Sequence, residues 1–253
     1  MRRITTYAVF ALSALTLVSC SDDGTEEVVS ASRAQLFADA EPYSRLVFEV
    51  DAVEGFTPSD IDDEVIKYVS SLVDKPDGIQ IVRDQTFPSR GANHIWTFDE
   101  MNTLFAEKSS VVLQPNEVRV HMVFLDGAYE GDTAVSVTLG LAWSTNIAMF
   151  EANILASCQR PILQGRLCGF TETAIWLHEF GHVLGLVDNG APLTSDHLDE
   201  EHGHHCSNPD CLMYWEYEGT KLVDALRGRL DASDDATIFE FDDACKADLA
   251  AIE

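Results

Sequence analysis

Basic residues are scarce in this chain of 253 residues, where 16 lysines and arginines stand against 43 aspartates and glutamates. The formal net charge of −27 repels nucleic acids and anionic membrane surfaces, so neither is expected as a partner. Solubility is the main expected effect of so acidic a surface. Calcium binding by the acidic stretches 196–201 and 231–243 stays open, although the second stretch lacks the glycine of an EF-hand loop.

The N-terminus has a short basic start and an apolar run from Ala8 to Val18, too brief to span a bilayer as a mature helix. The run ends in Leu-Val-Ser-Cys at residues 17–20, which resembles a bacterial lipobox. We therefore expect residues 1–19 to be a lipoprotein signal peptide, with a lipid on Cys20 as the only membrane attachment. The alternative is an ordinary secretory signal with a chance cysteine.

Residues 20–42 are acidic and polar at their start and are expected to form a tether, followed by a catalytic domain over 43–253. Ser21 after the lipidated cysteine resembles an outer-membrane sorting signal, and the sequence leaves the membrane face open. Without Arg2 and Arg3, 14 basic residues remain against 43 acidic ones, a formal charge of −29.

Export places the other cysteines in an oxidising compartment, where disulfides persist. Sequence proximity favours the pairs Cys158–Cys168 and Cys206–Cys211, with Cys245 left free. Spacing alone does not determine the connectivity.

The most informative stretch of the sequence is HExxHxxGxxD at residues 178–188. On a helix, His178 and His182 share one face and can bind one zinc ion, while Glu179 can act as the general base on a metal-bound water. Gly185 is suited to the left-handed backbone that ends such a helix. Asp188 can supply the third ligand, which leaves the open fourth position that a catalytic zinc requires.

The identity of the third ligand stays open at this stage. Spacing favours Asp188, whereas the preference of zinc for imidazole favours His197. The histidines in the segment 202–205 are a further alternative for the third ligand. Their other reading is an exposed histidine-rich tract that binds metal only incidentally. If His197 binds the metal, Asp188 can instead orient one of the helix histidines.

These residues resemble the metzincin clan of zinc metalloproteases, and Asp188 matches the third ligand of snapalysin-like members. The segment from Cys206 through Cys211 to Met213 has the C-x4-C-x-M spacing of archaemetzincins, with the methionine expected in a Met-turn beneath the zinc. The closing C-x-x-C of archaemetzincins is absent, so a second, all-cysteine zinc site is not expected. The resemblance covers roughly residues 118–217.

The resemblance implies an α+β fold, with a mixed sheet and the zinc helix in an upper lobe that ends near residue 186, and a smaller irregular or helical lower lobe. Hydrophobic patterning agrees with mixed α/β structure. The zinc helix is expected to begin near Thr171, and residues 135–143 are the candidate edge strand for substrate. Other expected strands are 46–50, 79–83, 118–125 and 146–150, and other expected helices are 58–72, 97–107, 221–230 and 239–252.

The predicted function is a zinc-dependent endopeptidase that hydrolyses peptides or proteins, with Glu179 assisting attack of zinc-bound water on the scissile carbonyl. Tyr214 and Tyr217 follow the methionine but lack the usual Met-x-Tyr spacing, so packing is their expected role. One alternative is a non-catalytic surface lipoprotein that binds a partner, against which the intact Glu179 argues. Another is a zinc hydrolase of a non-peptide amide.

Overall fold

The computed structural model describes residues 32–56, 58–159, 164–233 and 235–252. The predicted signal peptide, the lipidation site Cys20 and the first part of the tether lie outside these residues. The last part of the predicted tether belongs to the folded unit, because α1 (Arg33–Ala38) buries Phe37 in the core. Within the described ranges, no helix is both long and apolar enough to cross a membrane.

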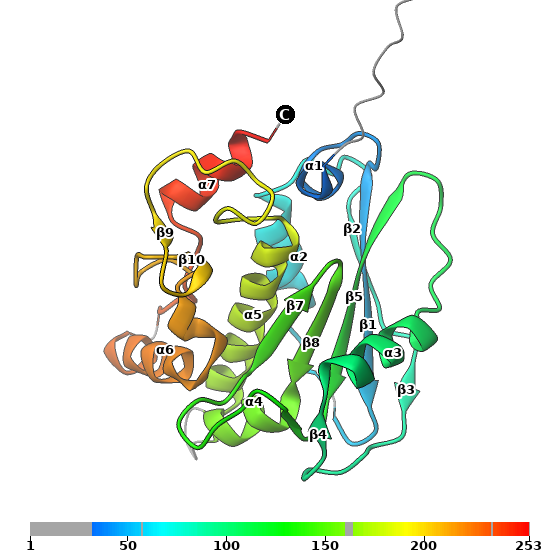
Figure 1. The fold of residues 1–253 in the computed structure, drawn as a ribbon, viewed down its shortest axis with the longest axis vertical. Coiled ribbons are helices and arrows are strands. Elements are labelled where there is room, and N and C mark those ends of the chain that lie inside the picture. Colours follow the sequence, from blue (N-terminus) through cyan, green and yellow to red (C-terminus); the bar gives the residue numbers. More distant parts are fainter. Residues whose placement is uncertain (1–31, 57, 160–163, 234, 253) are drawn as a thin grey trace, which may run out of the picture. The chain divides into compact units, whose positions relative to one another are not determined.

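A sheet of six strands has the order β2-β1-β5-β8-β7, with β3 also paired to β1 (Figure 1). Its pairings are parallel except at one edge, where β7 runs antiparallel to β8. The strands are β1 (Arg45–Val53), β2 (Ile79–Val82), β3 (Thr86–Phe87), β5 (Glu117–Leu125), β7 (Gly140–Trp143) and β8 (Asn146–Phe150). This sheet confirms the part of the fold prediction that called for a mixed sheet in an α/β structure.

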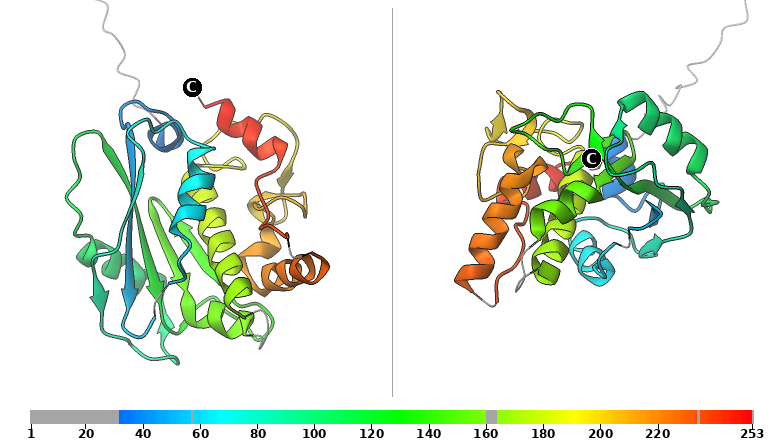
Figure 2. Two further views of the ribbon diagram at one scale, coloured as in Figure 1. Left: turned by 180° about the vertical axis from the view of Figure 1, so that it is seen from behind. Right: turned by 90° about the horizontal axis from the view of Figure 1, so that it is seen from below.

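Helices cover both faces of the sheet, with α2 and α5 on one face and α3 on the other (Figures 1 and 2). They are α2 (Asp62–Ser70), α3 (Phe98–Lys108), α4 (Glu151–Cys158), α5 (Gln164–Val183), α6 (Thr220–Ala232) and α7 (Asp243–Ala250). The side chains of β5 alternate accordingly. Met122 and Phe124 join the core against α5, whereas Val123 and Leu125 pack in the cluster that includes Leu104 of α3.

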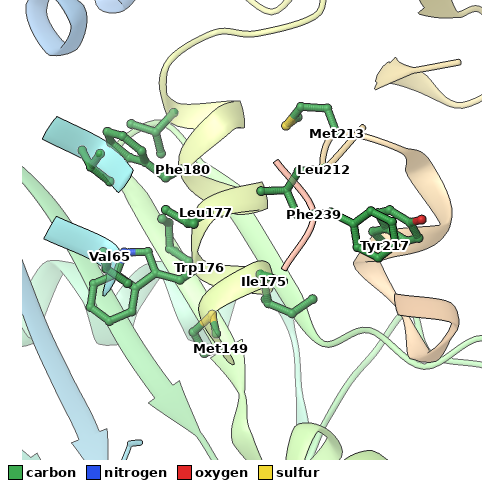
Figure 3. Packing of buried hydrophobic residues seen from close by; sticks show 14 of the residues in the cluster. Val65, Met149, Ile175, Trp176, Leu177, Phe180, Leu212, Met213, Tyr217 and Phe239 are labelled. Carbon is green, nitrogen blue, oxygen red and sulfur yellow. The ribbon is translucent and has the colours of Figure 1, made fainter. Parts of the chain in front are cut away.

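Helix α5 runs through the main core, and its apolar residues face several directions (Figure 3). Trp176 and Phe180 both make edge-on ring contacts with Phe48 of β1. On the opposite side of the helix lie Leu212 and Met213. A helix that is apolar almost all round is buried, so its few polar side chains must find partners inside the protein.

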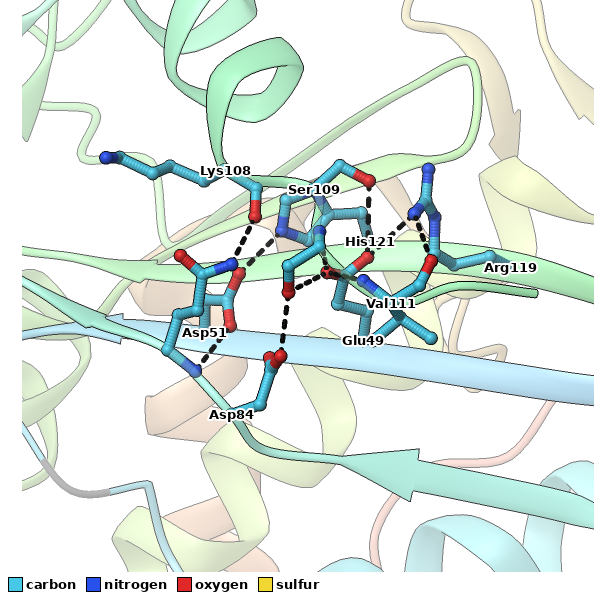
Figure 4. A network of polar contacts seen from close by, with 10 residues as sticks. Glu49, Asp51, Asp84, Lys108, Ser109, Val111, Arg119 and His121 are labelled. Carbon is cyan, nitrogen blue, oxygen red and sulfur yellow. Dashed lines mark hydrogen bonds and ion pairs between the residues drawn. The ribbon is translucent and has the colours of Figure 1, made fainter.

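On the α3 face of the sheet, a buried polar network links β1 to β5 and to two connecting segments (Figure 4). Glu49 accepts hydrogen bonds from the backbone of Ser110 and Val111, and Asp51 lies 2.9 Å from the His121 ring nitrogen. Glu49, Asp51 and His121 are close enough to one another to bind a cation. The carboxylate oxygens already accept hydrogen bonds from protein donors, so we interpret the network as structural.

The chain beyond α5 forms a second region from short elements (Figure 1). Here β9 (Leu198–Asp199) pairs antiparallel with β10 (Gly203–Cys206), followed by the 3-10 helix η1 (Trp215–Glu218) and then α6 and α7. A further small sheet pairs β4 (Ile95–Trp96) with β6 (Ala128–Tyr129).

Several predicted elements differ from the structure. Helix α5 begins at Gln164, not near Thr171, whose hydroxyl bonds to the Leu167 carbonyl one turn earlier inside the helix. The predicted strand 135–143 forms only over Gly140–Trp143, because residues 135–139 are an irregular connection. The helix predicted over 58–72 begins later, at Asp62, and the helix predicted over 239–252 begins at Asp243, with Asp242 as its cap.

The buried carboxyl of Glu151 gives a test of the fold. Glu151 is 1% exposed, and neither of its oxygens has a hydrogen-bond partner among the described residues. Burial, reinforced by the charge of Glu172, raises its pKa to about 9 from an ordinary value of 4.5. The folded state therefore binds a proton that the unfolded state releases, and this contribution to stability is lost as the pH rises from 4.5 toward 9.

We expect Glu151→Gln to abolish the loss of stability at high pH that Glu151 causes, because the amide carries no charge to bury. Its free energy of unfolding relative to wild type should increase by up to about 1.4 kcal/mol per pH unit above pH ~5. Urea denaturation at pH 5 and pH 8 measures the difference. The same substitution at exposed Glu64 should leave the pH dependence unchanged. Identical pH dependence in Glu151→Gln and wild type would contradict the prediction.

Candidate metal centre

Two histidines of α5 form the first half of the candidate site. His178 and His182 are one helical turn apart, and their ring centroids lie 5.0 Å from each other. His178 is fully buried, and its Nδ1 lies 2.6 Å from the Leu212 carbonyl oxygen. A hydrogen bond from Nδ1 leaves the lone pair on Nε2 for a metal, the usual way in which an outer contact orients a ligand.

The third histidine is His205, at the end of β10. Its ring centroid lies 5.4 Å from that of His178 and 4.9 Å from that of His182. Its Nδ1 lies 3.0 Å from the His202 carbonyl oxygen. The next residue, Cys206, donates its backbone N–H to the Met213 carbonyl at 2.8 Å. This pairing holds β10 against the segment that also orients His178, so His205 faces the helix histidines.

Glu218 completes the group at the end of η1. Ligand atoms of His178, His182, His205 and Glu218 all lie within 4.8 Å of one another. The Glu218 Oε1 atom is 3.1 Å from Nε2 of His205 and 3.7 Å from Nε2 of His182. The sequence alone gave no signal for Glu218, because its place depends on how the chain returns after Met213.

These residues fit a zinc ion. The Nε2 atoms of all three histidines are buried and have no hydrogen-bond partner among the residues that the structure describes. Burial, together with repulsion from His182 and His205, lowers the pKa of His178 to about 3, so its ring is neutral and able to bind a metal. Three imidazoles are a common donor set of catalytic zinc.

Glu179 is buried beside this group, next to β7. Neither of its carboxylate oxygens accepts a hydrogen bond within the described ranges. Burial, and then the negative charge of Glu218, raise its pKa well above the ordinary value. A carboxylate whose pKa is raised is a stronger base, as a group that takes a proton from water requires.

Met213 lies against α5 (Figure 3), directly after Leu212, whose carbonyl oxygen contacts His178. A Cβ atom added at Gly181 would collide with the Met213 sulfur and come within 3.0 Å of Phe241. The absence of a side chain at Gly181 thus allows the segment 211–214 to approach the helix between the two histidines. Gly185 ends the helix with φ 81°, which confirms its predicted left-handed conformation.

A cleft of about 360 Å³ opens in front of the histidines. Leu141 to Ser144, at the end of β7, form one wall, and His202 to His205 form the opposite wall. Strand β7 pairs with β8 on one side only and is therefore an edge strand, as predicted for part of residues 135–143. Trp215 stacks on His202 at 3.8 Å between ring centroids.

The structure does not bring Asp188 or His197 to the three histidines. Asp188 is exposed and has φ 59°, directly after the end of α5. His197 is buried elsewhere, with Nε2 2.8 Å from Asp248. The geometry therefore favours His205 as third ligand in place of either. The feature of the sequence that could have identified His205 is its position directly before Cys206, the first cysteine of the C-x4-C-x-M motif.

His197 instead belongs to a second cluster with three cysteines. Its Nδ1 lies 3.9 Å from Cys245 Sγ, and Cys245 Sγ lies 3.5 Å from Cys211 Sγ. Ligand atoms of His197, Cys206, Asp242 and Cys245 lie within 4.8 Å of one another. Contacts with Cys211 and Cys245 lower the pKa of Cys206, which favours a thiolate there.

The disulfide predictions are confirmed in one case and wrong in the other. Cys158 and Cys168 form a disulfide between α4 and α5. Cys206 and Cys211 are free thiols, because each turns toward the cluster around His197. Cys245 is free as expected, but it lies within that cluster.

The other candidate residues have contacts away from the three histidines. Tyr217 donates its hydroxyl to the Pro209 carbonyl at 2.6 Å, and its ring contacts Phe239, in agreement with the predicted packing role. His204 is exposed at the cleft wall.

No protein-family model matches the sequence, and no curated protein is similar enough to match it. The structure is similar to that of archaemetzincin from Methanopyrus kandleri, with a TM-score of 0.50 and 14% identity over 82% of this chain and 94% of that one. A zinc-dependent peptidase from Methanocorpusculum labreanum gives a TM-score of 0.46 and 13% identity, over 80% and 99% of the two chains. The first likeness shows an archaemetzincin-like fold.

The close packing of β7 against α5 gives a test of the site. A Cβ atom at Gly140 would lie 2.5 Å from Ile175 and 2.6 Å from the Glu179 carboxylate. We expect Gly140→Ala to displace β7 or Glu179 and to lower the free energy of unfolding by about 1–3 kcal/mol, as overpacking does.

Gly228 of α6 is the matched control, because nothing lies within 4 Å of a Cβ added there. Gly228→Ala should stabilise the protein by about 0.5–1 kcal/mol, since alanine favours the helix. Thermal or urea unfolding of both variants measures the effect. Equal stabilisation by the two substitutions would show that the approach of β7 to Glu179 is not close.

Proposed function

We propose that this protein is a zinc-dependent endopeptidase, with His178, His182 and His205 as the zinc ligands and Glu179 as the general base. The observation that carries the proposal is the juxtaposition of three buried, unpartnered imidazole nitrogens with a buried carboxylate of raised pKa. A purely structural metal site has no use for such a base. This argues against a non-catalytic binding protein on the same scaffold.

A bound zinc ion would supply Lewis acidity, lowering the pKa of water and polarising the scissile carbonyl. The protein's own groups do the remaining work. Glu179 accepts the proton of the attacking water and returns it to the leaving amine. Met213 and Gly181 hold the segment 211–214 against the helix, and Leu212 fixes the orientation of His178.

Peptides are the substrate class that the cleft favours. The free edge of β7 offers backbone groups that pair with an extended chain of almost any sequence. These groups lie beside Glu179, because β7 packs directly on α5 at Gly140. A hydrolase of non-peptide amides would have no need for this open strand beside the base.

The second cluster supports a second, structural zinc bound by His197, Cys206 and Cys245, whose ligand atoms lie within 4.8 Å of one another, and by Cys211, whose Sγ atom is 3.5 Å from that of Cys245. Zinc prefers these thiolates to the nearby carboxylate of Asp242. All four side chains are buried, and four protein ligands leave no open position, as in structural zinc sites. Asp248 bonds the far nitrogen of His197, the outer contact expected of a zinc-bound histidine. Zinc would hold β10 and the start of α7 together.

We also propose, on the sequence signals, that the protein is exported and anchored by a lipid on Cys20. The Cys158–Cys168 disulfide agrees with an oxidising compartment. Zinc at the second cluster would keep its three thiols from oxidation there.

The catalytic proposal is tested with a peptide library and the zinc-loaded protein. We expect cleavage by wild type, read by mass spectrometry, and a loss of at least about a hundredfold in kcat/KM for Glu179→Gln with its zinc content unchanged. Glu200, exposed beyond the cleft, is the control, and Glu200→Gln should cleave normally. No cleavage by folded wild type with two zinc ions would contradict the proposal.

The metal proposal is tested by zinc stoichiometry. We expect two zinc ions per wild-type chain after dialysis, and one each in His205→Ala and in Cys245→Ser. Asp188→Ala should retain two, because this carboxylate lies outside both clusters. Because zinc at the second site contributes to folding, Cys245→Ser should also unfold at lower temperature. Loss of one zinc from Asp188→Ala with retention of two in His205→Ala would reverse the assignment of the third ligand.

A further inference from the structure

Glu218 lies at ion-pair distance from two of the three histidines. Its Oε1 atom is 3.1 Å from Nε2 of His205, yet that nitrogen makes no well-aligned hydrogen bond in the described part of the chain. The Nε2 atom of His182 lies 3.7 Å from the same Glu218 oxygen and likewise has no hydrogen-bond partner among the described residues. One carboxylate oxygen of Glu218 and one ring nitrogen of each of the three histidines lie within 4.8 Å of one another, close enough for all four to bind one ion.

Three imidazoles and one carboxylate would fill the four positions of a tetrahedral zinc site. A closed site of this kind is typical of structural zinc, whereas catalysis requires a position for water and substrate. The buried base Glu179 shows that the site is not merely structural. A closed set of four ligands and a buried base in the same site are compatible if one of the four ligands can leave.

Glu218 is the ligand that is free to leave. His178 and His205 are held by backbone contacts at Nδ1, and His178 has no exposed surface. The side chain of Glu218 is 42% exposed, compared with 12% for His182, and it borders the cleft. A rotation of this side chain moves the carboxylate from the histidines into the cleft without disturbing the core.

The backbone of Glu218 is fixed, so the movement is confined to the side chain. Its carbonyl accepts a hydrogen bond from the Leu139 backbone at 2.9 Å, and Gly219 forms a β-bridge with Thr138. These contacts attach Glu218 to the segment that enters β7. Thus the same strand that offers its edge to a peptide also sets the position of the departing carboxylate.

We propose that Glu218 is a displaceable fourth ligand, which closes the metal site in the resting enzyme and swings into the cleft when water and substrate enter. The proposal deepens the zinc peptidase function and rests on it. While Glu218 is bound, the site has no exchangeable position and is inactive. When Glu218 departs, the coordinate bond of its carboxylate to the ion would be exchanged for one to water, beside Glu179.

The proposal is tested with cobalt in place of zinc and with azide as a small anion that needs an open position. Azide changes the cobalt absorption spectrum only where a ligand position is exchangeable, so a second site closed by four protein ligands does not contribute to the difference spectrum. If Glu218 occupies its position more than about nine-tenths of the time, wild type binds azide at least about tenfold more weakly than an open site does.

We therefore expect Glu218→Gln to bind azide at least about tenfold more tightly than wild type. Glu218→Asp, whose carboxylate is one methylene shorter, should show the same change. The matched control is Glu216→Gln on the same turn of η1, because this side chain is absent from the cluster and from the cleft wall. It should bind azide as wild type does.

The outcomes separate this inference from the proposed function. Equal azide affinity in wild type and both Glu218 variants would overturn the inference and leave the three-histidine site intact. Loss of the cobalt of this site from both variants would also overturn it, because Glu218 would then be a permanent ligand. If wild type and His205→Ala bind the same amount of cobalt, the three-histidine metal site itself fails, and the proposed function with it.

Discussion

One physical constraint shapes the rest of the structure. The polar side chains that helix α5 buries in the core must find hydrogen-bond or metal partners there. Helix α5 buries the side chains of His178 and Glu179 completely. An unpaired polar group in such a place costs about 1–3 kcal/mol. The Leu212 carbonyl offsets part of this cost at His178 Nδ1, and a metal ion would offset the rest. The close approach of the segment 211–214, which Gly181 permits, follows from this requirement.

The two metal-binding clusters share a short piece of chain. His205 belongs to the candidate group with His178, His182 and Glu218, and Cys206, the next residue, belongs to the second cluster. On an extended strand, successive side chains point to opposite sides, so β10 can serve both sites at once. The backbone bond from Cys206 to Met213 holds this strand in register with the segment beneath the helix. A metal at the second cluster would therefore stiffen the ligand frame of the first.

Strand β7 connects substrate binding to the chemistry. Its packing on α5 at Gly140 brings the edge of the sheet beside Glu179, and its entry segment is bonded to Glu218. Two carboxylates, the proposed base and the proposed displaceable ligand, thus lie near one strand. Their surroundings suit the different roles proposed for them, because Glu179 is fully buried and Glu218 borders the cleft.

The sequence by itself determined the helix that carries His178, Glu179 and His182 and most of the strands, because helical and strand periodicities are local properties that the residues display directly. It also predicted the Cys158–Cys168 disulfide, whose cysteines are close in the chain. Only the tertiary structure decided that His205 and Glu218 lie beside His178 and His182, and that Cys206, Cys211 and Cys245 are free thiols. His205, Glu218 and Cys245 reach their positions through loops and turns after α5, and the place of such residues is set by long-range packing that spacing along the chain does not encode.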